Sequence, residues 1–313
     1  MNRPTRSVDR PVIEVEELRM RYGAVDVLKG VSFEVRRGEV VALLGPNGAG
    51  KSTTIEILEG LRARSAGRVE VLGVDPAHGG EDWRARSGIV LQSWRDHAKW
   101  RVRELLAYQG SLYARYTTER MPRPWDVDEL LGAVGLSDHA GRRLSALSGG
   151  QRRRLDVAVG LVGRPELVYF DEPTAGLDPQ ARRDFHDLVR RVSRELDTTA
   201  LITTHDLAEA EQLADRIIIL TQGRIIADGT AEELARQIVG ADEVRWVQGG
   251  DRRTRLVADS TAFARELLLE HGTAVSALEI RRASLEDTYL TLVREAETAA
   301  MVADEQELQG AAR

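Results

Sequence analysis

Short apolar runs separated by polar stretches predict alternating strands and helices along most of this 313-residue chain. Val12–Val15 and Val31–Val35 alternate apolar and polar positions, which is the pattern of strands buried on one face. The continuous apolar run Val40–Leu44 instead fits a strand buried on both faces, as in a parallel sheet. Four more runs predict strands, the last three of them buried: Gly67–Gly73, Leu167–Phe170, Ala200–Thr203 and Ile217–Leu220.

Helical periodicity, with stop signals such as Gly163 and Pro165, fills most of the space between these strands. The helices are expected at Ser52–Leu61, Trp100–Tyr116, Asp126–Val134, Gln151–Val162, Pro179–Leu196 and Leu207–Ala214. The region between Gln92 and Leu144 is therefore mostly helical and irregular. Strands that alternate with helices predict an α/β fold, in which helices flank a parallel sheet.

The pattern restarts after about residue 240, which indicates a second, smaller unit. A short helix is expected within Gly229–Gly240. The elements expected after it are strands at Val244–Val247 and Arg255–Val257, a helix at Thr261–His271, a strand at Val275–Ile280 and a helix at Leu285–Val293. We therefore predict an N-terminal tail at 1–11, a main domain at 12–230, a small C-terminal α/β appendage at 231–296 and a flexible tail at 297–313.

Composition narrows the class of protein. The formal charge is −6 with 42% hydrophobic residues, which is ordinary for a globular protein and argues against general nucleic-acid binding. The absence of cysteine excludes disulfides, thiolate metal sites and a cysteine nucleophile. The longest apolar run has five residues, whereas a membrane span needs about 20. We expect a soluble, cytoplasmic chain without a secretory signal.

The clearest chemical motif is a glycine-rich loop between the Val40–Leu44 strand and the helix that follows. It reads Gly45, Pro46, Asn47, Gly48, Ala49, Gly50, Lys51, Ser52 and Thr53. Glycines let successive backbone N–H groups cradle phosphate oxygens, Lys51 can reach the β- and γ-phosphates, and the Ser52 hydroxyl can ligate Mg²⁺. The alternative is a chance glycine-rich turn. Only Lys29, Lys51 and Lys99 are lysines among the 44 basic residues, so a lysine at this place favours the functional interpretation.

Two further motifs lie where a predicted strand ends and where a predicted helix begins. The strand Leu167–Phe170 runs into Asp171, which is suited to holding Mg²⁺, and Glu172, which is suited to orienting the attacking water. The alternative is a pair of acids that only marks a strand end. Ser148, Gly149 and Gly150 stand directly before a helix, where they form either an anion site or an ordinary helix cap.

The pentapeptide Leu147–Gln151 resembles the signature of the ATP-binding-cassette (ABC) ATPases. It follows the phosphate loop and ends twenty positions before Asp171 (151 to 171). The resemblance covers about residues 12–230. It implies a P-loop NTPase fold with a parallel-sheet core, an antiparallel β subdomain and a helical subdomain, and it implies ATP and Mg²⁺ as ligands.

The resemblance also assigns roles by position. It implies that Tyr22 stacks on adenine, that Gln92 senses Mg²⁺ and the attacking water, and that His205 contacts the γ-phosphate. The loop with Asp178 is expected to cross a dimer interface. The implied catalytic residues are Glu172, His205 and Gln92, and the implied Mg²⁺ ligands are Ser52, Gln92 and Asp171. The implied nucleotide contacts are Tyr22, Gly45 to Thr53, Ser148, Gly149, Gly150, Gln151 and Asp178. Three of these residues also have an ordinary alternative. Tyr22 would be a half-buried tyrosine at a strand end, Gln92 a surface amide and His205 a structural histidine.

In this family two cassettes meet head to tail, and ATP on one phosphate loop is covered by Ser148, Gly149 and Gly150 of the other. One cassette per chain implies a homodimer or a heterodimer with a similar chain. The resemblance also implies a membrane permease of about six spans, received around Trp94–Arg103. The segment 93–103 holds four basic residues, one acid and two tryptophans. The alternative is a solvated charged helix with its tryptophans folded inward. We expect Arg152–Arg154 to be a solvated helix face.

The segment Arg282–Leu290 resembles the end of cassettes that serve ABC-2 type exporters, which include the daunorubicin-resistance-type drug exporters. This resemblance implies that the chain powers the export of drugs or other amphipathic compounds. It also implies that the chain lies at the cytoplasmic face of the cell membrane, bound to the permease. The competing function is a soluble, non-transport ABC ATPase that acts in translation or DNA repair. Such proteins generally carry two cassettes, a long coiled coil or zinc-binding cysteines. A phosphate-loop kinase or GTPase would lack Leu147–Gln151.

Overall fold

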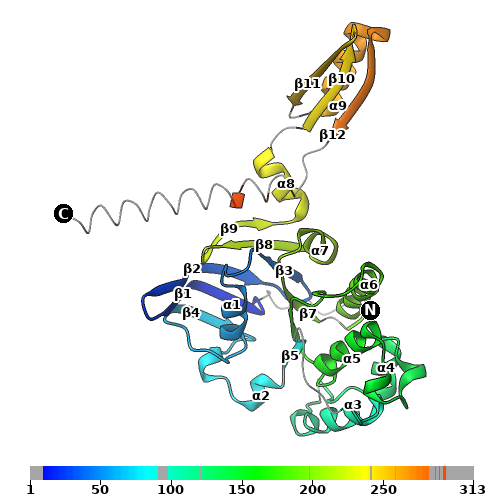
Figure 1. The fold of residues 1–313 in the computed structure, drawn as a ribbon. Helices are drawn as coiled ribbons and strands as arrows, with labels where there is room; N and C mark the ends of the chain where they lie inside the picture. Colours follow the sequence, from blue (N-terminus) through cyan, green and yellow to red (C-terminus); the bar gives the residue numbers. More distant parts are fainter. Residues whose placement is uncertain are drawn as a thin grey trace, which may run out of the picture. The chain divides into compact units, whose positions relative to one another are not determined.

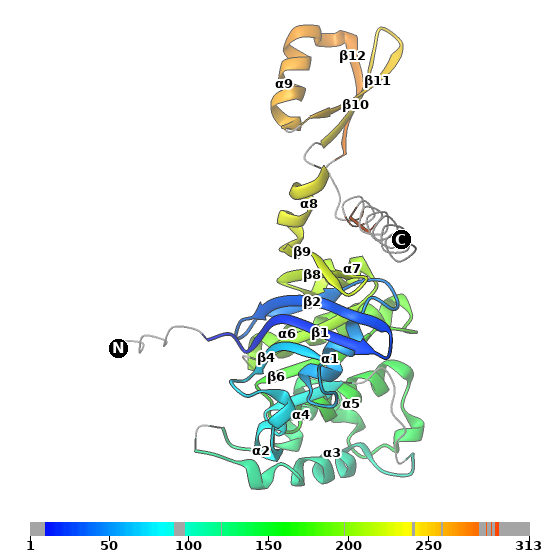
Figure 2. The ribbon, with the colours of Figure 1, turned by 90° about the vertical axis from the view of Figure 1, so that its left-hand side faces the viewer.

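The computed structural model describes residues 10–90, 98–119, 121–196, 198–239, 242–257 and 259–281, together with single positions 286, 289, 292 and 293. The chain divides into two compact units, Met1–Ile225 and Ile226–Arg313. Figures 1 and 2 show their elements from two directions.

A six-stranded sheet is the centre of the first unit, and only its edge strand continues past Ile225. Its strands, in spatial order, are β5 (Ser87–Val90), β6 (Leu167–Asp171), β7 (Thr199–Thr204), β3 (Val40–Leu44), β8 (Arg216–Thr221) and β9 (Arg224–Gly229). The pairs from β5 through β8 are parallel. The predicted parallel sheet is therefore confirmed. The hydrophobic pattern missed β5 and β9, because β5 has four residues and β9 is mostly half-exposed.

The apolar runs of β3 and β6 are continuous because both faces of the sheet are covered. In β6, Leu167 and Tyr169 pack into one core while Val168 and Phe170 pack into another. The first core also contains the antiparallel sheet and helix α1 (Lys51–Leu58), and the second contains side chains of the helical region. This two-sided burial is the physical reason for the continuous apolar runs.

A three-stranded antiparallel sheet covers the first face, as expected for the antiparallel β subdomain. Its order is β2 (Val25–Val35), β1 (Ile13–Tyr22) and β4 (Ala66–Val71), and Figure 2 shows the three strands side by side. Strands β1 and β2 are longer than the predicted Val12–Val15 and Val31–Val35. The register shifts between Val15 and Leu18, where Glu17 has a φ of 47°. Such an irregularity breaks the two-residue period that a sequence pattern relies on.

The helical region is the third part of the first unit, and Figure 1 shows α3, α4 and α5 lying together. Its members and the other helices of this unit are α2 (Glu81–Arg84), α3 (Val102–Ser111), α4 (Val127–Ala133), α5 (Gly149–Leu161), α6 (Pro179–Leu196) and α7 (Leu207–Leu213). Short 3₁₀ turns lie at Pro76–His78, Ala114–Tyr116, Ser137–His139 and Leu144–Ala146. The helix predicted at Trp100–Tyr116 is thus a shorter helix followed by a 3₁₀ turn.

The second unit contains the helix α8 (Ala231–Val239) and a small α/β layer. Strands β11 (Asp251–Val257), β10 (Asp242–Gln248) and β12 (Val275–Arg281) form an antiparallel sheet in that order, with a 3₁₀ turn at Gly272–Ala274 before β12. Helix α9 (Ser260–His271) packs on it around Val244, Trp246 and Leu267. These elements agree with the predicted appendage. The helix predicted at Leu285–Val293 lies largely outside the described residues, as does the tail 297–313.

Candidate functional site

The phosphate loop predicted from the sequence connects β3 to α1. Gly48 and Gly50 have φ values of 81° and 108°, which L side chains rarely adopt. A Cβ atom on Gly45 would lie 2.1 Å from the carbonyl oxygen of Leu220, so a side chain has no room there. Positive φ values at glycines allow successive N–H groups of such a loop to turn inward, which is suited to binding phosphate oxygens at the start of a helix.

Lys51 is buried at the base of this loop, with 5% of its surface exposed. Its Nζ donates to the carbonyl oxygens of Gly45 at 2.8 Å and Pro46 at 3.1 Å, and it lies 3.6 Å from Glu172 Oε1. Burial lowers the pKa of Lys51, and the carboxylates of Glu172 and Asp171 act in the opposite direction. The ammonium group is thus fixed by the loop and by the carboxyl end of β6. Next to it, Ser52 is exposed and Thr53 is half-buried.

Asp171 and Glu172 lie at the carboxyl end of β6, where the sequence placed them. The Thr203 hydroxyl donates to Asp171 Oδ1 at 2.7 Å and accepts from the backbone N–H of Glu172 at 3.0 Å. Glu172 has a φ of 41°, an uncommon conformation for a residue other than glycine. Its Oε1 lies 3.4 Å from His205 Nδ1 as well as 3.6 Å from Lys51 Nζ. The carboxylate therefore stands between two basic groups.

The order of the strands explains why residues so far apart in sequence meet. Strands β6, β7 and β3 are neighbours and parallel, so their carboxyl ends share one edge of the sheet. His205 follows β7 directly, and the Gly45 N–H donates to the Thr204 carbonyl at 3.2 Å. Ligands of open α/β sheets bind at this edge.

Ser148 to Gln151 form the start of α5, at a different place in the same unit. The Ser148 hydroxyl accepts from the Gln151 N–H at 3.3 Å, and Gln151 Oε1 accepts from the Ser148 N–H at 3.0 Å. This reciprocal pair is a capping box, so the ordinary role as a helix cap is also present. His139 holds the Gln151 amide at 3.0 Å.

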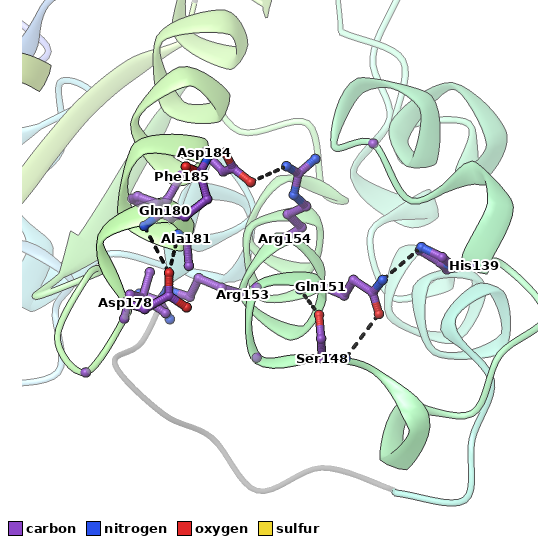
Figure 3. A pocket seen from close by; sticks show the side chains of 15 residues that line it. His139, Ser148, Gln151, Arg153, Arg154, Asp178, Gln180, Ala181, Asp184 and Phe185 are labelled. Atoms are coloured by element: carbon purple, nitrogen blue, oxygen red, sulfur yellow. Dashed lines mark hydrogen bonds and ion pairs between the residues drawn. The ribbon is translucent and has the colours of Figure 1, made fainter.

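A pocket of about 560 Å³ opens beside this helix start, and Figure 3 shows its lining. Ser148, Gly149 and Gly150 line it together with Asp178, which caps α6 by accepting from the N–H groups of Gln180 and Ala181. None of the described residues that line this pocket belongs to the phosphate loop. Within one chain the predicted site residues thus form two separate groups.

The remaining predicted site residues are Tyr22 and Gln92. Tyr22 ends β1 with 39% exposure, and the Arg62 guanidinium lies 5.0 Å from its ring centroid. Strand β2 of the same hairpin contacts the phosphate loop, because a Cβ atom on Gly50 would lie 2.6 Å from the side chain of Leu28. Gln92 lies outside the described residues, as do 94–97 of the segment Trp94–Arg103.

One expectation about arginine is wrong. Arg153 does not belong to a solvated helix face, because only 6% of it is exposed. It packs 5.5 Å from the Phe185 ring centroid, forms an ion pair with Asp156 and has a pKa lowered by burial. Neighbouring Arg152 and Arg154 keep about a quarter of their side chains exposed. Three consecutive arginines on a helix point in different directions, so at least one of them turns inward.

Sequence reasoning also missed several polar residues that support the site. Thr203 and Thr204 read as the end of an apolar strand, yet their hydroxyls hold Asp171 and Glu209. Glu59, the residue that follows α1, is also buried, with 9% of it exposed. The only available signal was a threonine pair at the carboxyl end of a buried strand.

Comparisons with known proteins identify the family. A family model described as ABC transporter matches residues 28–175. The linearmycin resistance ATP-binding protein LnrL of Bacillus subtilis (strain 168) is 33% identical over 270 residues, which cover 86% of this chain and 84% of that protein. The chain belongs to the ATP-binding subunits of ABC transporters. This cassette is therefore an ATPase, which binds and hydrolyses ATP.

Two further comparisons agree with this family. The cassette is 40% identical over 232 residues to the daunorubicin resistance ATP-binding protein DrrA3 of Streptomyces coeruleorubidus, covering 74% of this chain and 72% of that protein. Among solved structures, cbiO1 of Clostridium perfringens, part of the ABC transporter complex cbiONQ, matches with a TM-score of 0.64 and 29% identity. The match covers 72% of this chain and 91% of that one. The alternative of a non-transport ATPase is not favoured.

The described part of the chain contains neither a membrane-spanning helix nor a cluster of metal-ligating side chains. None of its helices combines the length and apolar character needed to cross a bilayer. Nor do the described residues contain three or more His, Asp or Glu side chains grouped as a metal site. The oxygen donors at the phosphate loop and at Asp171 fit an ion such as Mg²⁺, which is bound in ATPases by few protein ligands and by the nucleotide's phosphates.

Proposed function

We propose that this cassette hydrolyses ATP at the carboxyl edge of its six-stranded sheet and thereby powers a separate permease that exports drugs or other amphipathic compounds. The observation that carries the proposal is the position of Glu172 Oε1, 3.6 Å from Lys51 and 3.4 Å from His205. Its relatives LnrL and DrrA3, named for resistance to linearmycin and daunorubicin, support the direction of transport.

Each group at this edge has a chemical role in the proposal. The loop N–H groups and Lys51 bind the β- and γ-phosphates, and His205 contacts the γ-phosphate. Glu172 orients the attacking water and accepts its proton, and its carboxylate is aimed by the two basic neighbours. Ser52 and Asp171 hold Mg²⁺, which neutralises phosphate charge when bound, and Gln92 is proposed as its third protein partner.

A second cassette completes the site in this proposal. Ser148, Gly149 and Gly150 line a pocket. None of the described residues that line this pocket comes from the phosphate loop of the same chain. We therefore assign these residues, with Gln151 and Asp178, to the nucleotide held by a partner cassette, while Tyr22 stacks on adenine in its own chain. The partner is an identical or a similar chain.

The permease is assigned to the surface around 98–103, at the cytoplasmic face of the membrane. Lys99, Arg101 and Arg103 are exposed there. Trp100 is half-buried and packs edge-on against Tyr108 at 5.2 Å, so this tryptophan is partly folded inward. Tyr108 itself is 50% exposed. Exposed tyrosine and arginine are favoured anchors in interfaces.

Substitution Glu172→Gln tests the hydrolytic site. The variant keeps the shape of the side chain but cannot accept a proton, so we expect ATP binding without turnover and a persistent ATP-bound dimer. Sedimentation velocity with saturating ATP measures the assembly, and a phosphate-release assay measures turnover. Exposed Glu129→Gln serves as the matched control. A Glu172→Gln protein that stays monomeric with ATP, or turns over at the wild-type rate, would contradict the proposal.

The proposed role in export can be tested only with the permease present. We expect the cassette to co-purify with a permease of about six spans encoded in the neighbouring reading frame, and the complex to show ATPase activity stimulated by amphipathic drugs. Co-purification with ribosomes or DNA instead would contradict export.

A further inference from the structure

A buried polar network starts at Thr204, the residue before His205, and joins three elements of the first unit. Thr204 ends β7 with 1% exposure, Glu209 lies in the first turn of α7 with 2% exposure, and His186 lies in α6 with 3% exposure. Neither Glu209 nor His186 belongs to the site described above. A buried carboxylate is unfavourable unless it is bonded, so its bonds indicate what it holds in place.

The network fixes both neighbours of His205 in the chain. The Thr204 hydroxyl donates to Glu209 Oε2 at 2.5 Å, and the Asp206 N–H donates to Thr204 Oγ1 at 2.9 Å. The Glu209 N–H donates to Asp206 Oδ1 at 3.2 Å. The two residues that flank His205 are therefore tied to the start of α7, while the exposed imidazole projects toward Glu172.

The same carboxylate faces α6. Glu209 Oε1 lies 3.8 Å from His186 Nε2, and His186 Nδ1 is 2.8 Å from Gln212 Oε1. Arg182, one turn earlier in α6, binds Asp206 Oδ2 at 2.7 Å. Because α6 begins immediately after Asp178, these contacts connect the helix of the Asp178 loop with the segment that carries His205.

We propose that Glu209 is a positioning residue for ATP hydrolysis. By holding the Thr204 hydroxyl with Oε2, it fixes the end of β7 so that the His205 imidazole stays within contact of Glu172. Its second oxygen, Oε1, lies 3.8 Å from His186 Nε2 and has no hydrogen-bond partner among the described residues. The inference rests on the proposed function of Glu172 and His205. Misplacing a group at a reacting centre by a small distance lowers turnover more than binding, because orientation matters most in the transition state.

Steady-state ATP hydrolysis by the full chain tests this inference with three threonine variants. Thr204→Val removes the hydroxyl at nearly constant volume, and we expect kcat to fall about tenfold with KM within about twofold of wild type. Thr204→Ser keeps the hydroxyl and should recover kcat to within about twofold. Thr199→Val is the matched control. Thr199 is equally buried at the opposite end of β7, where its hydroxyl accepts from the Gly38 N–H at 3.0 Å.

A double variant tests whether Thr204 and Glu209 act through the same hydrogen bond. Glu209→Leu should lower kcat like Thr204→Val, and the pair combined should be no slower than either alone, because both remove the same link. A Thr204→Val enzyme with wild-type kcat, or a loss equal to that of Thr199→Val, would overturn the inference. The proposed function would survive that result if Glu172→Gln still abolished turnover, so the two failures are distinguishable.

Discussion

At the scale of single residues, burial decides what each charge does in this cassette. Lys51 and Arg153 are both buried cations with pKa values lowered by burial. Glu59 shows the opposite effect, since burial, with Asp171 and Glu56 nearby, raises the pKa of its carboxyl to about 8. A carboxyl with this pKa carries its proton at neutral pH in the folded protein.

Glu59 predicts a pH-dependent stability. The folded state keeps the proton up to about pH 8, whereas the unfolded chain loses it near 4.5. The free energy of unfolding should therefore fall as the pH rises from about 4.5 to 8. Glu59→Gln removes this dependence, so its stability relative to wild type should rise by on the order of 3 kcal/mol between pH 5 and pH 8.

Urea unfolding at the two pH values measures this difference. Exposed Glu119→Gln should track wild type at both. A Glu59→Gln protein whose advantage is the same at pH 5 and pH 8 would show that Glu59 is ionised in the fold.

At the scale of elements, close packing between α5 and β5 sets the position of the signature. A Cβ on Gly88 would lie 2.1 Å from the Gly160 carbonyl oxygen, and a Cβ on Gly160 would lie 2.6 Å from Val90. The helix therefore rests almost directly on the strand. Since Ser148 caps this helix, its position depends on the glycine contact.

Gly88→Ala should force α5 away from β5. We expect a loss of about 2 to 3 kcal/mol in the free energy of unfolding, as for other overpacked contacts. Urea unfolding of Gly132→Ala provides the contrast, because Gly132 is exposed in α4 with its nearest atom at 3.9 Å. That substitution should raise stability by up to about 1 kcal/mol. Equal effects of the two substitutions would show that the close approach carries no strain.

At the scale of the whole molecule, the two units differ in the size of their cores. The first has two large clusters that share the faces of the parallel sheet. In the second, the cluster on the β10 sheet has Val244, Trp246 and Leu267 as its buried members. A small core gives a unit little reserve of stability.

Trp246→Ala should unfold the β10 sheet and its helix while the cassette keeps its fold. Trp246 is 7% exposed, and its ring lies 5.5 Å from that of Phe263. Removing so large a side chain costs about 3 to 5 kcal/mol. Limited proteolysis should release a fragment close to residues 1–230 that retains ATPase activity, whereas exposed Thr254→Ala should resist cleavage. A Trp246→Ala protein as resistant as wild type would contradict this view of the core.

Much of the fold was predictable because its signals are local. The runs at Val40–Leu44 and Leu167–Phe170 are apolar at every position, which requires two covered faces wherever the strands lie. Strand β5 was missed because four residues with an exposed Ile89 carry too little pattern. Strands β1 and β2 were cut short because bulges interrupt their alternation.

The sequence alone determined the phosphate loop, the Asp171 and Glu172 pair and the Ser148 helix start, because each is contiguous and its chemistry depends on neighbouring residues. Only the tertiary structure decided that Glu172 lies within 3.6 Å of both Lys51 and His205, that Arg153 is buried, and that Glu209 holds the hydroxyl of Thr204, the residue before His205. These features follow from strand order and burial. Both arise from contacts between residues distant in sequence, which no local pattern records.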